Sequence, residues 1–164
     1  VNPTSLKPSL YKRNITEGGY NKTEKYVIKG NSITSTAKKG KKPETIRTFG
    51  IGSNTQDIVS TIYKIRTIDF STMKAGQAKS FTVVFDEEEL PVIVKYMGKE
   101  TVSAGSLGSK ECYKVSISAR TNALKGTDKN LMWLTADDKK VPVLIKFSIK
   151  VGVGQLTLTN ATGI

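Results

Sequence analysis

The sequence predicts a mainly β protein: a curved antiparallel meander sheet or half-barrel with one amphipathic helix. Three observations point to this class. Apolar and polar residues alternate over several short segments, turn-forming residues separate those segments, and one stretch alone changes to helical spacing. The chain has 164 residues, enough to bury a core, and we expect a single domain over residues 1–164.

Alternation is clearest near the carboxyl end, where every second residue from Val141 to Val151 is apolar. A side chain points to the opposite face at each step along a strand, so this period of two predicts a strand with one apolar face. The other segments expected to be strands are residues 20–29, 31–36, 45–49, 81–85, 92–96, 113–119, 131–135 and 155–159. We expect tight connections between them, including turns at residues 86–89 and 126–128.

Residues 54–68 form the one predicted helix, which we expect to lie against the concave side of the sheet. Ser53 or Asn54 is suited to cap its first turn, and Ser53 and Gln56 have the spacing of a capping box. The apolar residues at helical spacing are Ile58, Ile62 and Ile65, with Val59 and Tyr63 beside them.

Composition excludes several kinds of chemistry. The chain has no His, which removes the usual general base and the metal sites built on imidazole, and its one Cys cannot form an internal disulfide. We therefore predict no cofactor, no metal site and no enzymatic activity. No apolar run approaches the roughly 20 residues that cross a bilayer, so no transmembrane segment is expected. The start at Val1 indicates that processing, such as removal of a signal peptide, or trimming has taken away an upstream part.

The net charge of +12 indicates a surface that attracts anions. The cations are 22 Lys and 4 Arg spread along the chain, which argues against nucleic acid because Arg is the better reader of phosphate and guanine. The lysine run at residues 38–42 is either an anion or membrane-surface patch or a charged hairpin tip. We favour the hairpin tip, because exposed charge at tips and edges opposes aggregation.

Four residues are candidates for ligand binding: Tyr63, Arg66, Trp133 and Asp137. The lone Trp133 is interpreted first as a core anchor and second as the floor of a ligand pocket. Arg66 either pairs with a carboxylate or faces a polar ligand. Asp137 is better explained by a turn than by a paired-carboxylate hydrolase. Cys112 fits a packed, neutral thiol.

Two stretches together resemble a known family. The first is DIVSTIYKIRT at residues 57–67, leading to MKAGQ at 73–77, and the second is MWLTADDKKVPV at residues 132–143. YMGKETV at residues 96–102 and CYKV at 112–115 fit as well. The chain in this respect resembles the exported bacterial family called domain of unknown function 3108, over essentially its whole length.

The resemblance implies a strongly curved antiparallel sheet or half-barrel in a cell-envelope protein, periplasmic or otherwise extracytoplasmic. The positions that match the family's recurrent residues are Asp57, Ser60, Tyr63, Arg66, Trp133, Asp137 and Pro142. The family has no established activity, so the resemblance implies no catalytic role. Its members usually have further N-terminal strands, which this chain would then lack.

These observations lead to one functional expectation and one alternative. We expect a non-catalytic envelope protein, either a scaffold or a domain that holds a lipid, another amphipathic ligand or an envelope protein against its curved sheet. The alternative is a polyanion-binding module that uses the lysine-rich surface. The sequence leaves the oligomeric state open.

Overall fold

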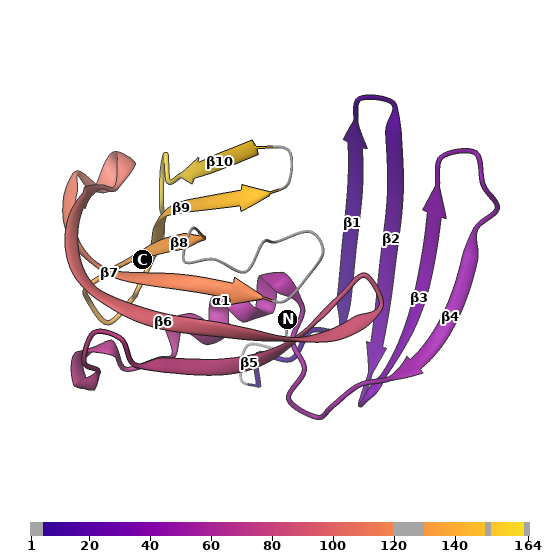
Figure 1. The fold of residues 1–164 in the computed structure, drawn as a ribbon, viewed down its shortest axis with the longest axis horizontal. Coiled ribbons are helices and arrows are strands. Elements are labelled where there is room, and N and C mark those ends of the chain that lie inside the picture. The colour runs from indigo at the N-terminus through magenta and orange to yellow at the C-terminus, as the bar shows by residue number, and fades with distance from the viewer. Residues whose placement is uncertain (1–4, 120–129, 150–151, 163–164) are drawn as a thin grey trace. The chain divides into compact units, whose positions relative to one another are not determined.

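The computed structural model describes residues 5–119, 130–149 and 152–162. Over these residues the protein is mainly β, with antiparallel meander connections and one α-helix, which confirms the predicted class (Figure 1). The strands are divided between two sheets. The predicted turn at residues 126–128, and Lys150 and Val151 of the predicted last alternating strand, lie outside the described residues.

The first sheet has four strands in the order β1-β2-β3-β4. They are β1 (Leu10–Glu17), β2 (Tyr20–Lys29), β3 (Ser32–Lys39) and β4 (Thr45–Gly50). The second sheet has six strands in the order β10-β9-β8-β7-β6-β5. They are β5 (Ala78–Phe85), β6 (Glu88–Ser103), β7 (Ser109–Ala119), β8 (Leu131–Thr135), β9 (Pro142–Ile149) and β10 (Gly152–Thr157).

The helix α1 (Ile58–Arg66) precedes the second sheet, and two short 3-10 helices, η1 (Phe70–Thr72) and η2 (Gly105–Leu107), lie in connections. None of the helices in the described part of the chain is long and apolar enough to cross a membrane.

The chain divides into two compact units. The first contains residues 1–63 together with 82–89, and the second contains residues 64–81 and 90–164. The tip of the hairpin β5–β6 thus belongs with the four-stranded sheet. The expectation of one domain over the whole chain stays a prediction.

In the first unit, β1 to β4 have one sheltered face and one exposed face. Along β2 the sheltered residues Lys22, Glu24, Tyr26 and Ile28 alternate with more exposed neighbours. Tyr26, Ile33 and Val84 form a buried apolar cluster, so the hairpin tip supplies part of the core of this sheet. We call this side the inner face and the opposite side the outer face.

The hairpin tip turns through two non-glycine residues in the left-handed region. Asp86 has a φ of 50° and Glu87 a φ of 64°. Two-residue hairpin turns of type I′ need positive φ at both positions, which usually selects Asn or Gly. Such backbone persists where the surroundings hold it in place, and here they do: the Glu87 amide donates a 2.8 Å hydrogen bond to the Tyr26 hydroxyl.

Ion pairs complete this hold on the tip. Asp86 contacts Arg13 and accepts a 2.8 Å bond from Lys22, while both of these cations also contact Glu24. The Glu24 side chain is 1% exposed, with Arg13 at 2.8 Å and Lys22 at 3.2 Å. Removing one partner of a buried pair typically costs about 3–5 kcal/mol, far more than losing a surface pair. This cluster is therefore a strong constraint on the first unit.

The second residue of the tip is held in the same way. The Glu87 carboxylate accepts bonds from Ser35 at 2.6 Å and Arg47 at 2.7 Å. Glu89 accepts from the Gly52 amide at 2.8 Å and contacts the Thr55 hydroxyl. The acidic segment 86–89, expected to be a simple turn, is thus a turn and also an anchor.

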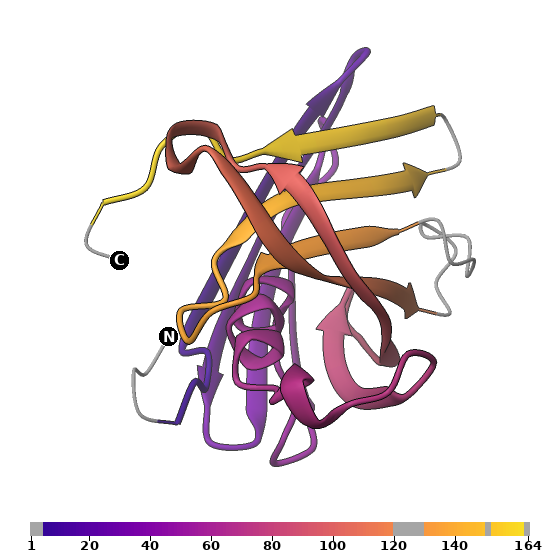
Figure 2. The same ribbon diagram turned by 90° about the vertical axis from the view of Figure 1, so that its left-hand side faces the viewer.

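In the second unit, β6 has 16 residues and bends along its length (Figures 1 and 2). Its register with β7 shifts between Tyr96 and Gly98, and Gly98 has a φ of 112°. A bulge at this position bends the strand, and glycine accepts the backbone angle without a steric penalty. Phe70 packs against Tyr96 and Tyr113 on one face of this sheet, with ring centroids 5.7 and 5.2 Å away.

The helix differs from the prediction at its start and its end. It begins at Ile58 because Gln56 is part of the sheet: its amide bonds to Thr82 at 2.9 Å, and its carbonyl accepts from Val84 at 2.8 Å. Asp57 is therefore the cap, with its Oδ1 2.6 Å from the Ser60 amide. The predicted capping box of Ser53 and Gln56 was wrong, because Gln56 pairs with a strand instead of joining the helix. At the other end, the helix stops at Arg66 rather than at residue 68.

The ion-pair cluster predicts acid sensitivity of the first unit. Burial alone would raise the pKa of Asp86, but hydrogen bonds from Lys22 and Arg13 outweigh it and lower the pKa below its usual value. A carboxyl with a lowered pKa stabilises the fold above its unfolded-state pKa, and the stabilisation is lost as pH falls through the folded-state pKa. We expect amide exchange protection of β2 and β3, followed by NMR, to fall below about pH 4.

The control for this effect is Asp86→Asn, which removes the charge and keeps the shape. The variant should be less protected than the parent chain at pH 6, and the difference should shrink as the pH falls below about 4. A difference that stays constant from pH 6 to the acid limit would contradict the assignment to Asp86.

Candidate functional site

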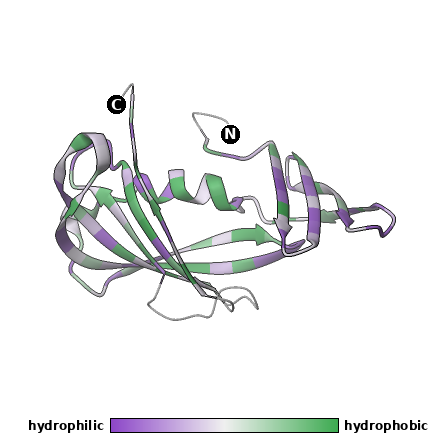
Figure 3. Ribbon diagram, turned by 90° about the horizontal axis from the view of Figure 1, so that it is seen from above, coloured by the Kyte–Doolittle hydropathy of each residue, from purple (hydrophilic) through white to green (hydrophobic). Residues whose placement is uncertain are grey.

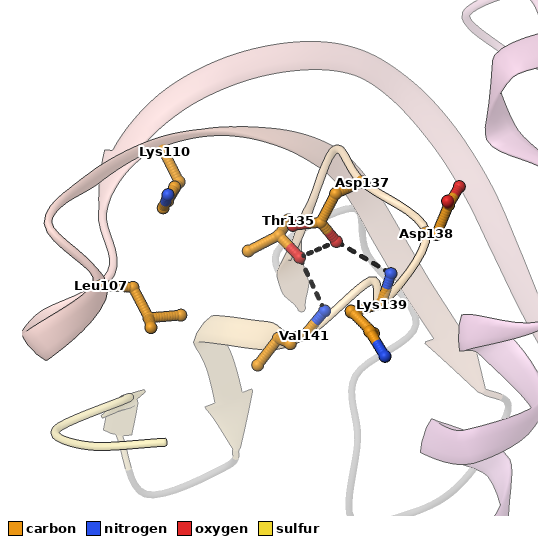
Figure 4. Close-up of a pocket in the computed structure, with 7 residues that line it drawn as sticks. All are labelled: Leu107, Lys110, Thr135, Asp137, Asp138, Lys139 and Val141. Atoms are coloured by element: carbon orange, nitrogen blue, oxygen red, sulfur yellow. Dashed lines mark hydrogen bonds between the residues drawn. The ribbon is translucent and has the colours of Figure 1, made fainter. Parts of the chain in front are cut away.

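One carboxylate oxygen organises the loop between β8 and β9. Asp137 Oδ1 accepts bonds from Thr135 Oγ1 at 2.8 Å and from the Lys139 amide at 3.0 Å (Figure 4). It also accepts from the Lys140 amide at 3.0 Å. Thr135 Oγ1 in turn accepts from the Val141 amide at 2.8 Å, which joins the two ends of the loop. Asp137 therefore forms a turn, as the sequence interpretation favoured.

These bonds also determine the charge state of Asp137. Burial would raise its pKa, but the hydrogen bonds from Thr135 and from the two backbone amides outweigh it, so the pKa is lowered. The group is an ionised acceptor at neutral pH and has no proton to donate. A general-acid role does not fit this environment.

A pocket of about 370 Å³ lies beside this loop (Figure 4). Its lining residues are Leu107, Lys110, Thr135, Asp137, Asp138, Lys139 and Val141. They come from η2, from the start of β7 and from the loop itself. Charges of both signs line the pocket, whereas sites for apolar molecules are lined mostly by hydrophobic and aromatic side chains.

Arg66 meets the same loop from the end of α1. Its Nε and Nη2 donate to the Lys139 carbonyl at 3.1 and 2.9 Å. The guanidinium fork thus binds a backbone oxygen of the loop that Asp137 closes. The structure brings these two candidate residues together within the second unit, with a supporting contact between helix end and loop.

Trp133 is 3% exposed and packs with Ala104, Cys112, Val141 and Val143. Its indole Nε1 donates to Glu100 Oε2 at 3.3 Å. The environment is that of a core anchor with a satisfied N–H group. The alternative role as the floor of a ligand pocket stays a prediction.

Charged side chains surround the Trp133 ring. The ammonium groups of Lys114 and Lys146 lie 5.3 and 5.4 Å from the ring centroid, within cation–π range. Lys114 also pairs with Glu100 at 2.8 Å. Hydrogen bonds from Lys114 and from Trp133 lower the pKa of Glu100.

Sequence reasoning missed these three charged partners of Trp133. Lys114 stands directly opposite Trp133 in the pairing of β7 and β8. That neighbourhood depends on strand register, which alternation within one strand does not specify. The sequence therefore did not indicate that these charged residues lie beside Trp133.

Tyr63 lies on α1 in the first unit and is 44% exposed, whereas Arg66, Trp133 and Asp137 belong to the second unit. Cys112 is buried in the Trp133 cluster, and this burial raises the pKa of its thiol to about 11. The thiol is therefore protonated at neutral pH and is a weak nucleophile. Among the described residues, no group of three or more Cys, Asp or Glu side chains is placed to hold a metal ion.

The model of the family described as Protein of unknown function (DUF3108) matches residues 1–159. The chain belongs to this family. The resemblance seen in residues 57–67 and 132–143 is thereby confirmed, and those segments contain the Asp57 cap and the Asp137 loop. No curated protein and no solved structure gave a significant match.

The hydrogen bonds of the loop predict that the adjacent residues Asp137 and Asp138 contribute unequally to stability. Asp137→Ala should lower the free energy of unfolding by about 2–3 kcal/mol, because it removes hydrogen bonds to a charged acceptor. Asp138→Ala is the matched control and should change it by less than about 0.5 kcal/mol, as for most surface substitutions. Urea unfolding followed by the fluorescence of Trp133, the only tryptophan, measures both. Equal losses in the two variants would contradict the assignment.

Proposed function

We propose that this family member is a non-catalytic binding domain of the cell envelope that holds an apolar or amphipathic ligand or partner. The observation that supports the proposal is the exposed apolar side of α1. The extracytoplasmic location is part of the proposal and is based on the export implied by the sequence resemblance.

Between Ile58 and Tyr63, helix α1 exposes apolar side chains and buries polar ones, whereas Ile65 near its end is buried. Ile58 is 40% exposed, Val59 49% and Tyr63 44%, while Ser60 is 0% and Thr61 5% exposed. Of the apolar residues that the helical spacing brings together, Ile58, Val59 and Tyr63 are thus exposed. Thr61 satisfies its buried hydroxyl by donating to the Asp57 carbonyl at 2.7 Å, which allows the polar side to face inward.

The exposed side of α1 suits an apolar contact. Covering the half-exposed side chains of Ile58, Val59 and Tyr63 would contribute about 1 kcal/mol each, since full burial of a large apolar side chain is worth about 1.5–3 kcal/mol. A molecule with an apolar part can make this contact without a preformed enclosed cavity. We name these three residues the helix patch.

The absence of enzymatic activity in the proposal is supported by the polar groups of the second unit. Asp137 is bound to its own loop, Arg66 to a backbone carbonyl and Glu100 to Lys114 and Trp133. Cys112 is protonated. In the described part of the chain these groups are bonded to structural partners, which does not favour their use as a nucleophile or base.

The helix patch predicts a specific binding defect. We expect lysophosphatidylcholine, a zwitterionic amphiphile, to bind the parent chain in isothermal titration calorimetry below its micelle concentration. The Val59→Ser/Tyr63→Ser variant should bind about 30-fold more weakly, because two apolar contacts of about 1 kcal/mol each are lost.

The matched control changes two exposed apolar residues elsewhere in the chain. Val153 and Leu156 are 86% and 60% exposed, so Val153→Ser/Leu156→Ser removes comparable apolar surface from another element, β10. Its affinity should equal that of the parent chain. Loss of binding in the control alone, or no binding in the parent chain, would reject the helix patch.

A second candidate, polyanion binding through lysines, is favoured by a basic pocket at the tips of β1–β2 and β3–β4. The pocket measures about 410 Å³, and its lining residues are Gly19, Tyr20, Asn21, Lys39, Gly40, Lys41 and Lys42. Lys39 Nζ lies 5.0 Å from the centroid of the Tyr20 ring. The lysine run is thus a hairpin tip, as favoured from the sequence, and it also surrounds a concave basic surface.

This candidate predicts heparin binding that weakens steeply as salt rises, because each neutralised anion releases counterions. Replacing Lys39, Lys41 and Lys42 by Gln should lower both the affinity and its salt dependence. An affinity that does not change between 50 and 200 mM salt, about the range over which such binding collapses, would reject it.

A further inference from the structure

The outer face of the four-stranded sheet has an unusual charge distribution. Strand alternation places four lysines on it: Lys12, Lys25, Lys29 and Lys38. None of the outer-face positions of β1 to β4 holds an Asp or Glu. The acidic residue near the centre of this sheet, Glu24, points to the inner face, where the hairpin tip adds Asp86 and Glu87.

The lysines lie close to one another on this face. Lys12 and Lys25 are directly paired across β1 and β2. Lys25 is paired with Thr36, so Lys38 lies diagonally beside it on β3. Like charges directly opposite each other destabilise a sheet, and among the described residues no acidic side chain pairs with these lysines. An external anionic surface would relieve this repulsion.

The remaining residues of the outer face indicate what kind of anion it fits. It contains no Arg and no aromatic side chain, the groups that stack on nucleobases and bind phosphate in a bidentate manner. It does contain aliphatic residues among the lysines: Leu10 is 48% exposed and Ile46 68%. Ile46 is paired with Thr36, in the row of Lys12 and Lys25. Hydrophilic residues recur along these strands (Figure 3).

We propose that the outer face of β1 to β4 is a docking surface for an anionic lipid bilayer. Four strands about 4.8 Å apart form a platform about 14 Å wide, which spans several headgroups. The ammonium groups meet headgroup phosphates, and Leu10 and Ile46 enter the interface beside them. The proposal goes beyond the polyanion candidate, because it uses different lysines from those of the basic pocket and is tested separately.

Sedimentation with vesicles tests this surface. The chain should bind vesicles that contain phosphatidylglycerol in proportion to its content, and should not bind pure phosphatidylcholine. The Lys12→Gln/Lys25→Gln/Lys38→Gln variant should bind roughly 100-fold more weakly, since each lysine near an anionic membrane contributes about 5-fold. Leu10→Ser/Ile46→Ser should weaken vesicle binding several-fold and leave heparin binding unchanged.

The control removes the same charge elsewhere. Lys74, Lys79 and Lys139 are exposed and belong to the second unit, so their triple Gln variant matches the change in net charge. It should bind vesicles within about 2-fold of the parent chain, because the bilayer contacts the other unit. An equal loss in both triple variants would overturn the proposal in favour of general electrostatic attraction.

Heparin separates this inference from the polyanion candidate. Heparin binding that depends on Lys39, Lys41 and Lys42, with no binding to anionic vesicles, would overturn the bilayer proposal and leave the candidate standing. Vesicle binding lost only in the outer-face variant supports the bilayer proposal, whatever the result for heparin. Heparin binding that depends on Lys12, Lys25 and Lys38, without vesicle binding, would identify a soluble acidic polymer as the occupant and overturn the lipid assignment.

Discussion

The ion-pair cluster around Glu24 and Asp86 is the constraint on which the first unit depends. A four-stranded meander needs something to cover its apolar face, and here the cover is the tip of a hairpin from much later in the chain. Apolar contact through Val84 supplies part of the adhesion. The ion pairs fix the position of the tip on the sheet, because Arg13 and Lys22 each contact both Glu24 and Asp86. A displaced tip would take Asp86 away from Arg13 and Lys22 and would uncover Glu24.

The same use of polar groups recurs in the second unit. The carboxylate of Asp137 holds a loop closed, Arg66 attaches the end of the helix to that loop, and Trp133 is fixed by Glu100. Three of the residues that the sequence offers as candidates for ligand binding, Arg66, Trp133 and Asp137, thus make structural contacts. The proposed functions therefore use surfaces: the helix patch, the basic pocket and the outer face of the first sheet.

Much of the fold was predictable because alternation within a strand is a local property. The strands at residues 20–29 and 131–135 were located correctly, since each is bounded by turn residues. The start of the helix was not, because Gln56 pairs with a strand that lies more than twenty residues away in the chain. The charged residues around Trp133 were not predicted for the same reason. Register between strands is set by the whole sheet, and a single sequence does not display it.

The discontinuity of the first unit has a consequence for the order in which it forms. Strands β1 to β4 are complete once residue 50 has been made, but the covering residues 82–89 come more than thirty residues later. A chain produced from its amino end at about 5–20 residues per second passes through a stage in which Glu24, Tyr26 and Ile33 are uncovered. Such open sheets are prone to pair with other chains. Like charge on the outward lysines opposes association between copies of this sheet during that interval.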